Sequence, residues 1–457
     1  LVFLVKSSHS PQMQLLLDAP IVSMLCRLAI PNLVAVTMMT CIFFADARFI
    51  GQLGTTALAS LAVVFPFQSL MQMMAAGAIG GGITSSVARA LGSGDRFKAE
   101  ESAWHGLIII GVMSLLYTLV LGAFCRPIFS LLGATEEVLD GSVIYSRILF
   151  GGAFVGWLFF MLSALLRAIG EIPLLSRIII TSSLVQILLS GALTLGWGPF
   201  PSAGISGPAT ATLLCHAAAG AYMLITIIRG NVGIRLIPHS FNMQTINDIM
   251  KVGGIGLLNS TAIAFTVVIV TGLVGRYGTE ALAGYGLGSR LEIMLIPIAF
   301  GIGGVLTTAV GANFGAGKYN RARNIAWLGF GATFVSTGII GIIAATEPSL
   351  WLDRVTNDPK AYSYGALYLS FAALFYGFFG GGQSLYFASQ GTGRMLIPVT
   401  VSISRLILVA TIGMLSVRFS WDISVIFGTV GAGLAIFGVG NAANMFSNIW
   451  RQKQAVE

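Results

Sequence analysis

Long stretches without a charged side chain are the feature that most limits what this chain can fold into. Residues 28–45 contain no Asp, Glu, Lys or Arg, and comparable apolar runs recur along all 457 residues. A helix needs about 20 apolar residues to cross a bilayer. Only 9% of the residues are charged, whereas soluble domains carry roughly 25%. The chain is therefore predicted to be a polytopic membrane protein.

Polar breaks divide the sequence into twelve apolar runs of membrane-spanning length, so we predict an all-α fold with twelve transmembrane helices. The predicted spans are 28–50, 57–91, 102–124, 147–168, 174–197, 207–228, 252–275, 281–314, 324–346, 361–389, 395–417 and 423–449. The longest internal polar break separates two groups of six. The predicted parts are an N-terminal segment (1–27), an N-terminal six-helix lobe (28–228), a linker (229–251), a C-terminal six-helix lobe (252–450) and a tail (451–457).

The distribution of Lys and Arg predicts the orientation in the membrane. With both termini in the cytoplasm, 17 of the 25 basic residues lie on the cytoplasmic side, as the positive-inside rule requires. The N-terminal segment, the linker and the tail are then cytoplasmic, and the expected location is the cell membrane. The net charge of +8 comes from dispersed residues rather than a basic run, so nucleic acid is not an expected partner.

The two halves of the sequence repeat each other. The segment GQLGTTALAS (51–60) matches GRYGTEALAG (275–284), and LGSGDRFKAEESAW (91–104) matches FGAGKYNRARNIAW (314–327), at offsets of 224 and 223. Because each half has six spans, the repeat is parallel. Two bundles related in this way place a substrate site between them and alternate access by rocking. A channel is the alternative, but the sequence contains no filter motif of the TVGYG kind.

Among 17 acidic residues, only Asp46 and Glu292 fall inside predicted spans. A charge at the centre of a membrane helix costs about 2.5 to 3.5 kcal/mol, so such residues usually face a cavity. Arg48 is two positions from Asp46 and points to a different side of the helix. Asp46 is then a lone carboxyl group that favours its protonated form when desolvated. The alternative is that Asp46 reaches the outer interface.

Glu292 lies near the middle of the eighth predicted span, and the repeat aligns it with Gln68. It either contacts cationic substrates or pairs with a neighbouring helix, since Arg290 is again two positions away. Met71 belongs to a group of methionines that either forms an adaptable cavity wall or simply packs between helices.

Motif order, duplication and span count together resemble the multidrug and toxic compound extrusion (MATE) family. The resemblance rests on D-x-x-x-x-G (46–51) running into LGTTALAS, and on the loops GSGDRFKAE and GAGKYNRAR. It covers about residues 24 to 450. It implies a two-lobed exporter that moves amphipathic, often cationic organic compounds in exchange for H⁺ or Na⁺.

The resemblance also implies roles for individual residues. Asp46 matches the first-span aspartate implicated in ion coupling, while Gln186 and Ser190 occupy positions that carry Asn and Asp in some branches of the family. A Na⁺ site needs several oxygen ligands and usually a carboxylate, so H⁺ is the expected coupling ion and Na⁺ the alternative. The predicted ion-coupling residues are Asp46, Gln186 and Ser190, and the predicted substrate-cavity residues are Glu292, Gln68, Asn259, Gln383, Tyr386 and Met71.

Other functions are less consistent with the sequence. A lipid-linked or polysaccharide flippase of the same superfamily would need a more basic cavity, and only Arg290 and Arg405, each expected near a helix end, are available. A membrane enzyme would need clustered carboxylates or an HExxH motif, and the sequence has neither. We therefore expect a monomeric transporter of small organic substrates in a lipid bilayer, with no enzymatic activity, metal or cofactor.

Overall fold

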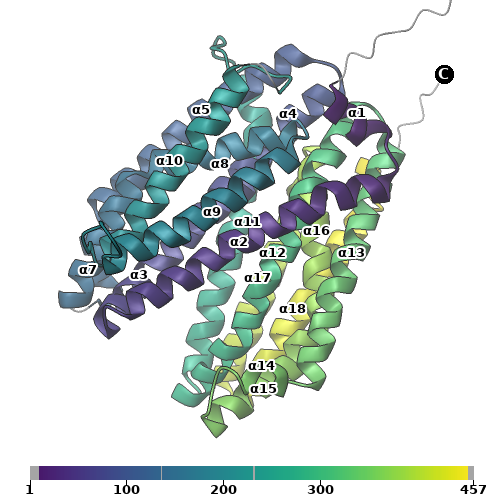
Figure 1. Cartoon of the computed structure of the whole chain (residues 1–457). Coiled ribbons are helices and arrows are strands. Elements are labelled where there is room, and N and C mark those ends of the chain that lie inside the picture. Colours follow the sequence, from purple (N-terminus) through teal and green to yellow (C-terminus); the bar gives the residue numbers. More distant parts are fainter. Residues whose placement is uncertain (1–9, 135, 230–231, 451–457) are drawn as a thin grey trace, which may run out of the picture.

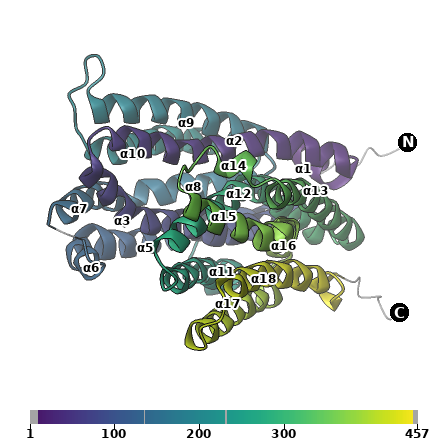
Figure 2. The same ribbon diagram turned by 90° about the horizontal axis from the view of Figure 1, so that it is seen from below.

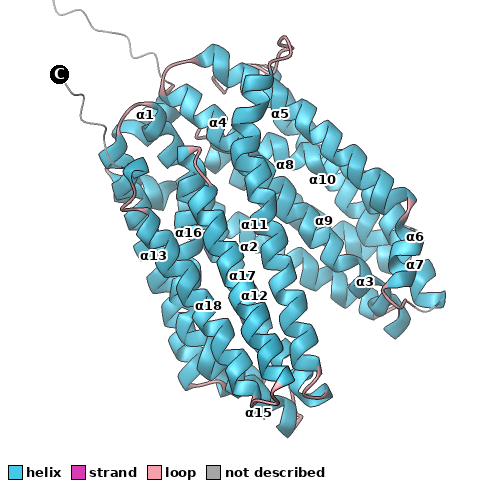
Figure 3. Ribbon diagram, turned by 180° about the vertical axis from the view of Figure 1, so that it is seen from behind, coloured by secondary structure: helices cyan, strands magenta, loops and turns pink. Residues whose placement is uncertain are grey.

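A computed structural model describes residues 10–134, 136–229 and 232–450, and every regular element in this part of the chain is helical (Figure 3). The first half contains α1 (Pro11–Asp18), α2 (Ile21–Gly51), α3 (Thr55–Gln72), η1 (Met73–Ile79), α4 (Gly80–Gly92), α5 (Arg96–Tyr117), η2 (Thr118–Ala123), α6 (Cys125–Leu131), α7 (Glu136–Gly151), α8 (Ala153–Ala168), α9 (Ile172–Leu195) and α10 (Ser206–Ile228). The second half contains α11 (Met243–Gly275), α12 (Thr279–Gly315), α13 (Tyr319–Thr346), α14 (Ser349–Leu352), α15 (Pro359–Ala372), η3 (Ala373–Phe375), α16 (Tyr376–Thr392), α17 (Leu396–Arg418), α18 (Ile423–Asn444) and η4 (Asn448–Trp450).

The structure confirms the all-helical membrane fold class. Eleven helical segments of the described residues are long and apolar enough to cross a membrane, and α7 with α8 makes a twelfth span. These two helices meet at a bend of 49°. The predicted span 147–168 was therefore wrong in its start, because a broken helix does not show as one uninterrupted apolar run.

Several helices also begin earlier than the apolar runs predict. The first spanning helix starts at Ile21 rather than at residue 28, and α11 starts at Met243, inside the predicted linker. The Asn242 side chain caps α11 by accepting a hydrogen bond from the backbone N–H of Gln244. A prediction based on apolar residues alone does not include such polar helix ends. The predicted tail, 451–457, and residues 1–9 lie outside the described residues.

The internal repeat is visible in the backbone. Gly54 and Gly278 precede α3 and α12 with φ angles of 116° and 114°, and Gly94 and Gly317 follow α4 and α12 with φ angles of 81° and 72°. Residues other than glycine rarely adopt such angles. The matched sequence blocks thus encode the same turns in both halves.

The two halves form separate groups of helices that meet at one end (Figure 1). In that view α2 to α10 and α11 to α18 lie together near α1 and α4 and spread apart below. The first described helix, α1, lies at the closed end (Figure 2), and its Met13 and Leu16 share a buried cluster with Met445 and Trp450. There α4 packs against α11, α12 and α16, and α2 packs against α12. A Cβ atom on Gly82 would lie 2.6 Å from the backbone oxygen of Ile249, so this close approach requires a glycine.

Candidate functional site

Asp46 is buried inside the N-terminal lobe. It lies on α2, only 4% exposed, and one carboxylate oxygen accepts a hydrogen bond of 2.5 Å from the hydroxyl of Ser190 on α9. None of the ion pairs among the described residues involves Asp46, and Arg48 does not pair with it. The burial excludes the alternative in which Asp46 reaches the outer interface. The lobe therefore holds a carboxyl group whose observed hydrogen-bond partner is uncharged.

The other residues predicted on α9 and α3 lie in the same lobe. Gln186 is one turn from Ser190 on α9, but its amide donates a hydrogen bond of 2.8 Å to the hydroxyl of Thr212 on α10 rather than to Asp46. Tyr145 of α7 lies near the Asp46 carboxylate, and its hydroxyl donates to Gln68 Oε1 at 3.3 Å. Hydroxyl and amide groups from α3, α7, α9 and α10 thus lie in the same lobe as this acid.

Met71 is buried beside this group, with an exposed fraction of 4%. Its methyl carbon would lie 3.7 Å from a Cβ atom on Gly156 of α8. Met71 therefore packs between helices of the N-terminal lobe in this conformation, which agrees with the packing alternative from the sequence.

Glu292 is paired with a neighbouring helix, as one of the two sequence alternatives proposed. One carboxylate oxygen accepts a hydrogen bond of 2.8 Å from the Tyr368 hydroxyl on α15, and the other lies 3.9 Å from a terminal nitrogen of Arg405 on α17. The expectation that Arg405 sits near a helix end was wrong, because α17 runs from Leu396 to Arg418 and places it near the middle. The C-terminal lobe therefore encloses an acid and a base together.

Three predicted cavity residues gather where the lobes meet. Asn259 of α11 with Gln383 and Tyr386 of α16 line a small pocket, together with Gly77 of η1 and Phe300 of α12. The predicted substrate-cavity residues are therefore divided among the N-terminal lobe, the C-terminal lobe and the junction between them. Neither Gln68 nor Met71 lines this small pocket.

Polar contacts join the lobes at the closed end, and no sequence motif marks their residues. Arg89 of α4 forms an ion pair of 2.8 Å with Asp248 of α11, and Ser86 donates to the same carboxylate at 2.7 Å. The only sequence signals were an acidic residue inside a predicted linker and a basic residue at a predicted span end. Both are ordinary features of loops, so pattern alone does not connect them.

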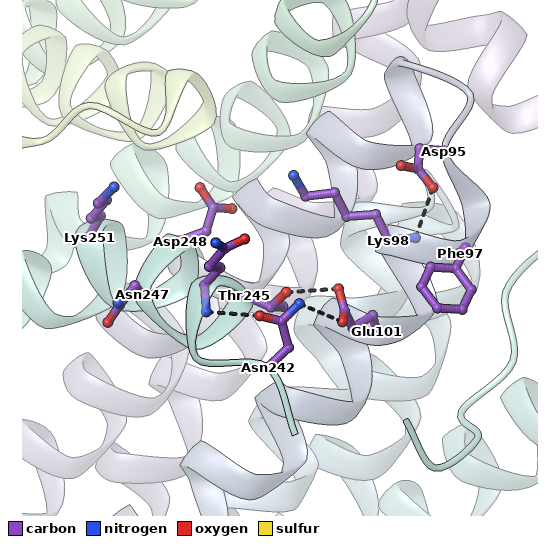
Figure 4. Close-up of a pocket in the computed structure, with 10 residues that line it drawn as sticks. Asp95, Phe97, Lys98, Glu101, Asn242, Thr245, Asn247, Asp248 and Lys251 are labelled. Atoms are coloured by element: carbon purple, nitrogen blue, oxygen red, sulfur yellow. Dashed lines mark hydrogen bonds between the residues drawn. The ribbon is translucent and has the colours of Figure 1, made fainter. Parts of the chain in front are cut away.

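A polar pocket of about 560 Å³ lies beside these contacts, between the start of α5 and the start of α11 (Figure 4). In Figure 4 the side chains of Asn242 and Thr245 both point to Glu101, and they donate hydrogen bonds of 2.9 and 2.8 Å to its two oxygens. None of the predicted site residues lines this pocket. The pocket lies where the first turns of α11 contact α5 of the N-terminal lobe.

Asp46 and Glu292 differ in the groups that surround them. Within the described ranges, no three His, Cys, Asp or Glu side chains gather at one point as a metal ion would need. Asp46 has a hydroxyl donor, and Glu292 has a hydroxyl donor and a guanidinium. The lone acid can change its charge without breaking an ion pair.

Two repeated helical lobes, joined at one end, with Asp46 inside one and Glu292 inside the other, define a two-lobed membrane transporter. The MatE family model matches the chain twice, over residues 31–190 and 257–415. The chain belongs to the multidrug and toxic compound extrusion (MATE) family, whose members are transporters rather than enzymes.

Relatives and solved structures agree with this assignment. The chain is 26% identical to a FAD transporter of Shewanella oneidensis, with 86% of this chain and 87% of the relative covered. It is 24% identical to the probable multidrug resistance protein NorM of Thermotoga maritima, with 83% and 82% covered. A multidrug resistance MATE family transporter of the MOP superfamily, solved in an outward-facing conformation, matches with a TM-score of 0.90 at 19% identity, with 98% of this chain and 99% of that chain covered.

Proposed function

We propose that this protein is a secondary active antiporter that exports amphipathic organic compounds in exchange for H⁺, with Asp46 as the proton carrier. The observation that carries the proposal is the burial of Asp46 with a hydroxyl donor but no cationic partner among the described residues. An ionised carboxylate in this apolar setting is high in free energy, and binding a proton removes its charge. The lobe can therefore alternate between a protonated and a deprotonated state.

Competition at Asp46 would couple the two flows. A deprotonated Asp46 attracts a cationic centre, and a protonated Asp46 does not, so a proton and a cationic substrate exclude each other. Gln186 lies one turn from Ser190 on α9, and Met71 supplies a flexible apolar surface in the same lobe. We therefore propose amphipathic cations as the first substrate class to test, carried between the lobes by alternating access.

One proton per cycle is energetically sufficient for useful export. Moving one charge across 100 mV releases about 2.3 kcal/mol, and a tenfold concentration difference requires about 1.4 kcal/mol. Na⁺ is the less favoured coupling ion because several oxygen ligands would have to gather around one carboxylate.

The proposed orientation places the closed end, with both termini, in the cytoplasm of a monomer in the cell membrane. Basic residues favour that side in the sequence. The contacts of α4 with α11, α12 and α16 would then seal the cytoplasmic side, so the described state would be open outward.

A flippase for anionic lipid-linked compounds is the second candidate, and one observation favours it. Arg405 is buried within the C-terminal lobe, where it could meet an anionic group. Its charge is balanced by Glu292, which argues against a strongly basic cavity. The relative named as a FAD transporter supports an anionic substrate as this second candidate.

Transport in proteoliposomes tests the proposed function. A fluorescent cation should move against its gradient under an imposed pH gradient, and Asp46→Asn should abolish this movement. Asp140→Asn is the matched control, because it neutralises an exposed aspartate of the same lobe that pairs with Arg126. Uphill transport that persists in Asp46→Asn contradicts the assignment, and transport driven only by a Na⁺ gradient replaces H⁺ with Na⁺.

A further inference from the structure

Arg405 is a buried hydrogen-bond donor inside the C-terminal lobe. Arg405 is 8% exposed, and its one ion-pair contact, with Glu292, is 3.9 Å long. A guanidinium carries five N–H donors, and its hydrogen bonds to carboxylates normally measure about 2.7 to 2.9 Å. The Nε atom of Arg405 is buried and has no hydrogen-bond partner in the described structure. Most of the donor capacity of Arg405 is therefore unused.

A second unused donor lies near the same acid. Tyr376 of α16 is fully buried near Glu292, and its hydroxyl has no partner among the described residues. Glu292 is already engaged by the Tyr368 hydroxyl at 2.8 Å. Since an unpaired buried polar group costs about 1 to 3 kcal/mol, a cluster with two such groups is suited to an additional acceptor.

The backbone leaves room for Arg405 to hold this position. A Cβ atom on Gly433 of α18 would lie 3.1 Å from Cγ and 3.6 Å from Nε of Arg405. The arginine side chain thus crosses α18 where that helix has no side chain. Glu292, Tyr368, Tyr376, Arg405 and Gly433 come from α12, α15, α16, α17 and α18, so five helices enclose the cluster.

We infer that Arg405 forms an oxyanion-binding subsite in the C-terminal lobe, which takes the carboxylate or phosphate group of an amphipathic substrate. A planar guanidinium binds either group through two parallel hydrogen bonds. The incoming oxyanion replaces the long contact with Glu292 and accepts the free donors of Arg405 and Tyr376. The inference deepens the proposed function, because it assumes that the lobe interior belongs to the substrate path. It adds an anionic substrate group to the cationic centre expected near Asp46.

Equilibrium binding tests the subsite without any ion gradient, so the result does not depend on H⁺ coupling. The probes share a pyrene body and carry a butyrate, a butanol or a butyl-trimethylammonium group, and binding is followed by fluorescence in an uncharged maltoside detergent. The full-length protein should bind the butyrate at least threefold more tightly than the butanol. Glu292→Gln should strengthen butyrate binding about tenfold, because it removes the competing carboxylate.

Two further variants separate the subsite from general charge effects. Arg405→Gln should abolish the preference for butyrate, and the double variant Glu292→Gln/Arg405→Gln should do the same without leaving an unpaired buried charge. Arg290→Gln should keep the preference, because Arg290 is exposed two positions from Glu292 on α12. Equal binding of butyrate and butanol by both the unmodified protein and Glu292→Gln would overturn the inference, as would a preference that survives in the double variant.

Discussion

The two lobes share a repeated backbone but surround Asp46 and Glu292 with different groups. Asp46 accepts a hydrogen bond from Ser190 and has no cationic partner in the described structure, whereas Glu292 is held between Arg405 and Tyr368. The acids do not occupy equivalent positions, since an offset of 224 relates Asp46 to Val270 and Gln68 to Glu292. Duplication has preserved the helices and their turns, and the charges have diverged.

This difference separates two chemical behaviours. A lone buried acid gains from binding a proton, whereas an acid beside a guanidinium gains from staying ionised. The N-terminal lobe is therefore suited to a change of charge during the cycle. The C-terminal lobe is suited to hold a neutral pair that a charged ligand can rearrange.

The largest expected effect comes from removing the lone acid. Asp46→Asn should reduce the substrate gradient formed under an imposed pH gradient to the passive level. Glu292→Gln should impair export of cationic substrates by less than about tenfold, or 1.4 kcal/mol, because the charge of Glu292 is already compensated. Initial rates and final gradients in proteoliposomes measure both. Similar losses in the two variants would remove the functional distinction between the lobes.

Removing Arg405 from its ion pair with Glu292 should lower the free energy of unfolding more than it changes the coupling of transport to protons. Arg405→Gln leaves Glu292, a partly buried acid, without its cation, and the free energy of unfolding should fall by about 2 kcal/mol, less than for a fully buried pair. The double variant Glu292→Gln/Arg405→Gln should recover most of this loss. Thermal unfolding in detergent provides the measurement, and a double variant no more stable than Arg405→Gln would argue against a paired role.

Ser190→Ala should alter the pH dependence of transport and preserve the fold. The Ser190 hydroxyl stabilises the ionised form of Asp46, and a hydrogen bond to a charged group contributes about 1.5 to 3 kcal/mol. Its removal makes the carboxyl group hold its proton to higher pH. The pH of half-maximal export should rise by about one unit, which corresponds to roughly 1.4 kcal/mol. An unchanged pH profile would mean that this contact does not control the proton.

The smallest effect is expected at an uncharged pair in the N-terminal lobe. Thr212→Val keeps the side-chain shape but removes the hydroxyl that accepts from Gln186 at 2.8 Å. The free energy of unfolding should fall by about 1 kcal/mol, with no change in the pH profile of export. A loss as large as that of Arg405→Gln would contradict the view that the ion pair is the stronger constraint.

The sequence by itself determined that this protein lies in a membrane, how many spans it has and that its halves repeat. These features depend on the lengths of apolar segments and on turn glycines, which are local properties of the chain. Gly54 and Gly278 could be matched from ten-residue blocks, and the structure gives both the same left-handed φ region. The scarcity of acids likewise singled out Asp46 and Glu292. The sequence therefore located the two acids inside the membrane spans but did not identify the side chains that contact them.

Only the tertiary structure decided those partners. Ser190 is 144 positions from Asp46, and Tyr368 is 76 positions from Glu292. Arg405 had been expected near a helix end, yet the packing of α17 beside α11 and α18 carries it into the lobe interior. Hydrophobicity fixes which segments enter the membrane, but the rotation and packing of each helix fix which side chains meet. Because a buried charge is governed by its nearest neighbours, the same helical repeat yields a lone acid in one lobe and an ion pair in the other.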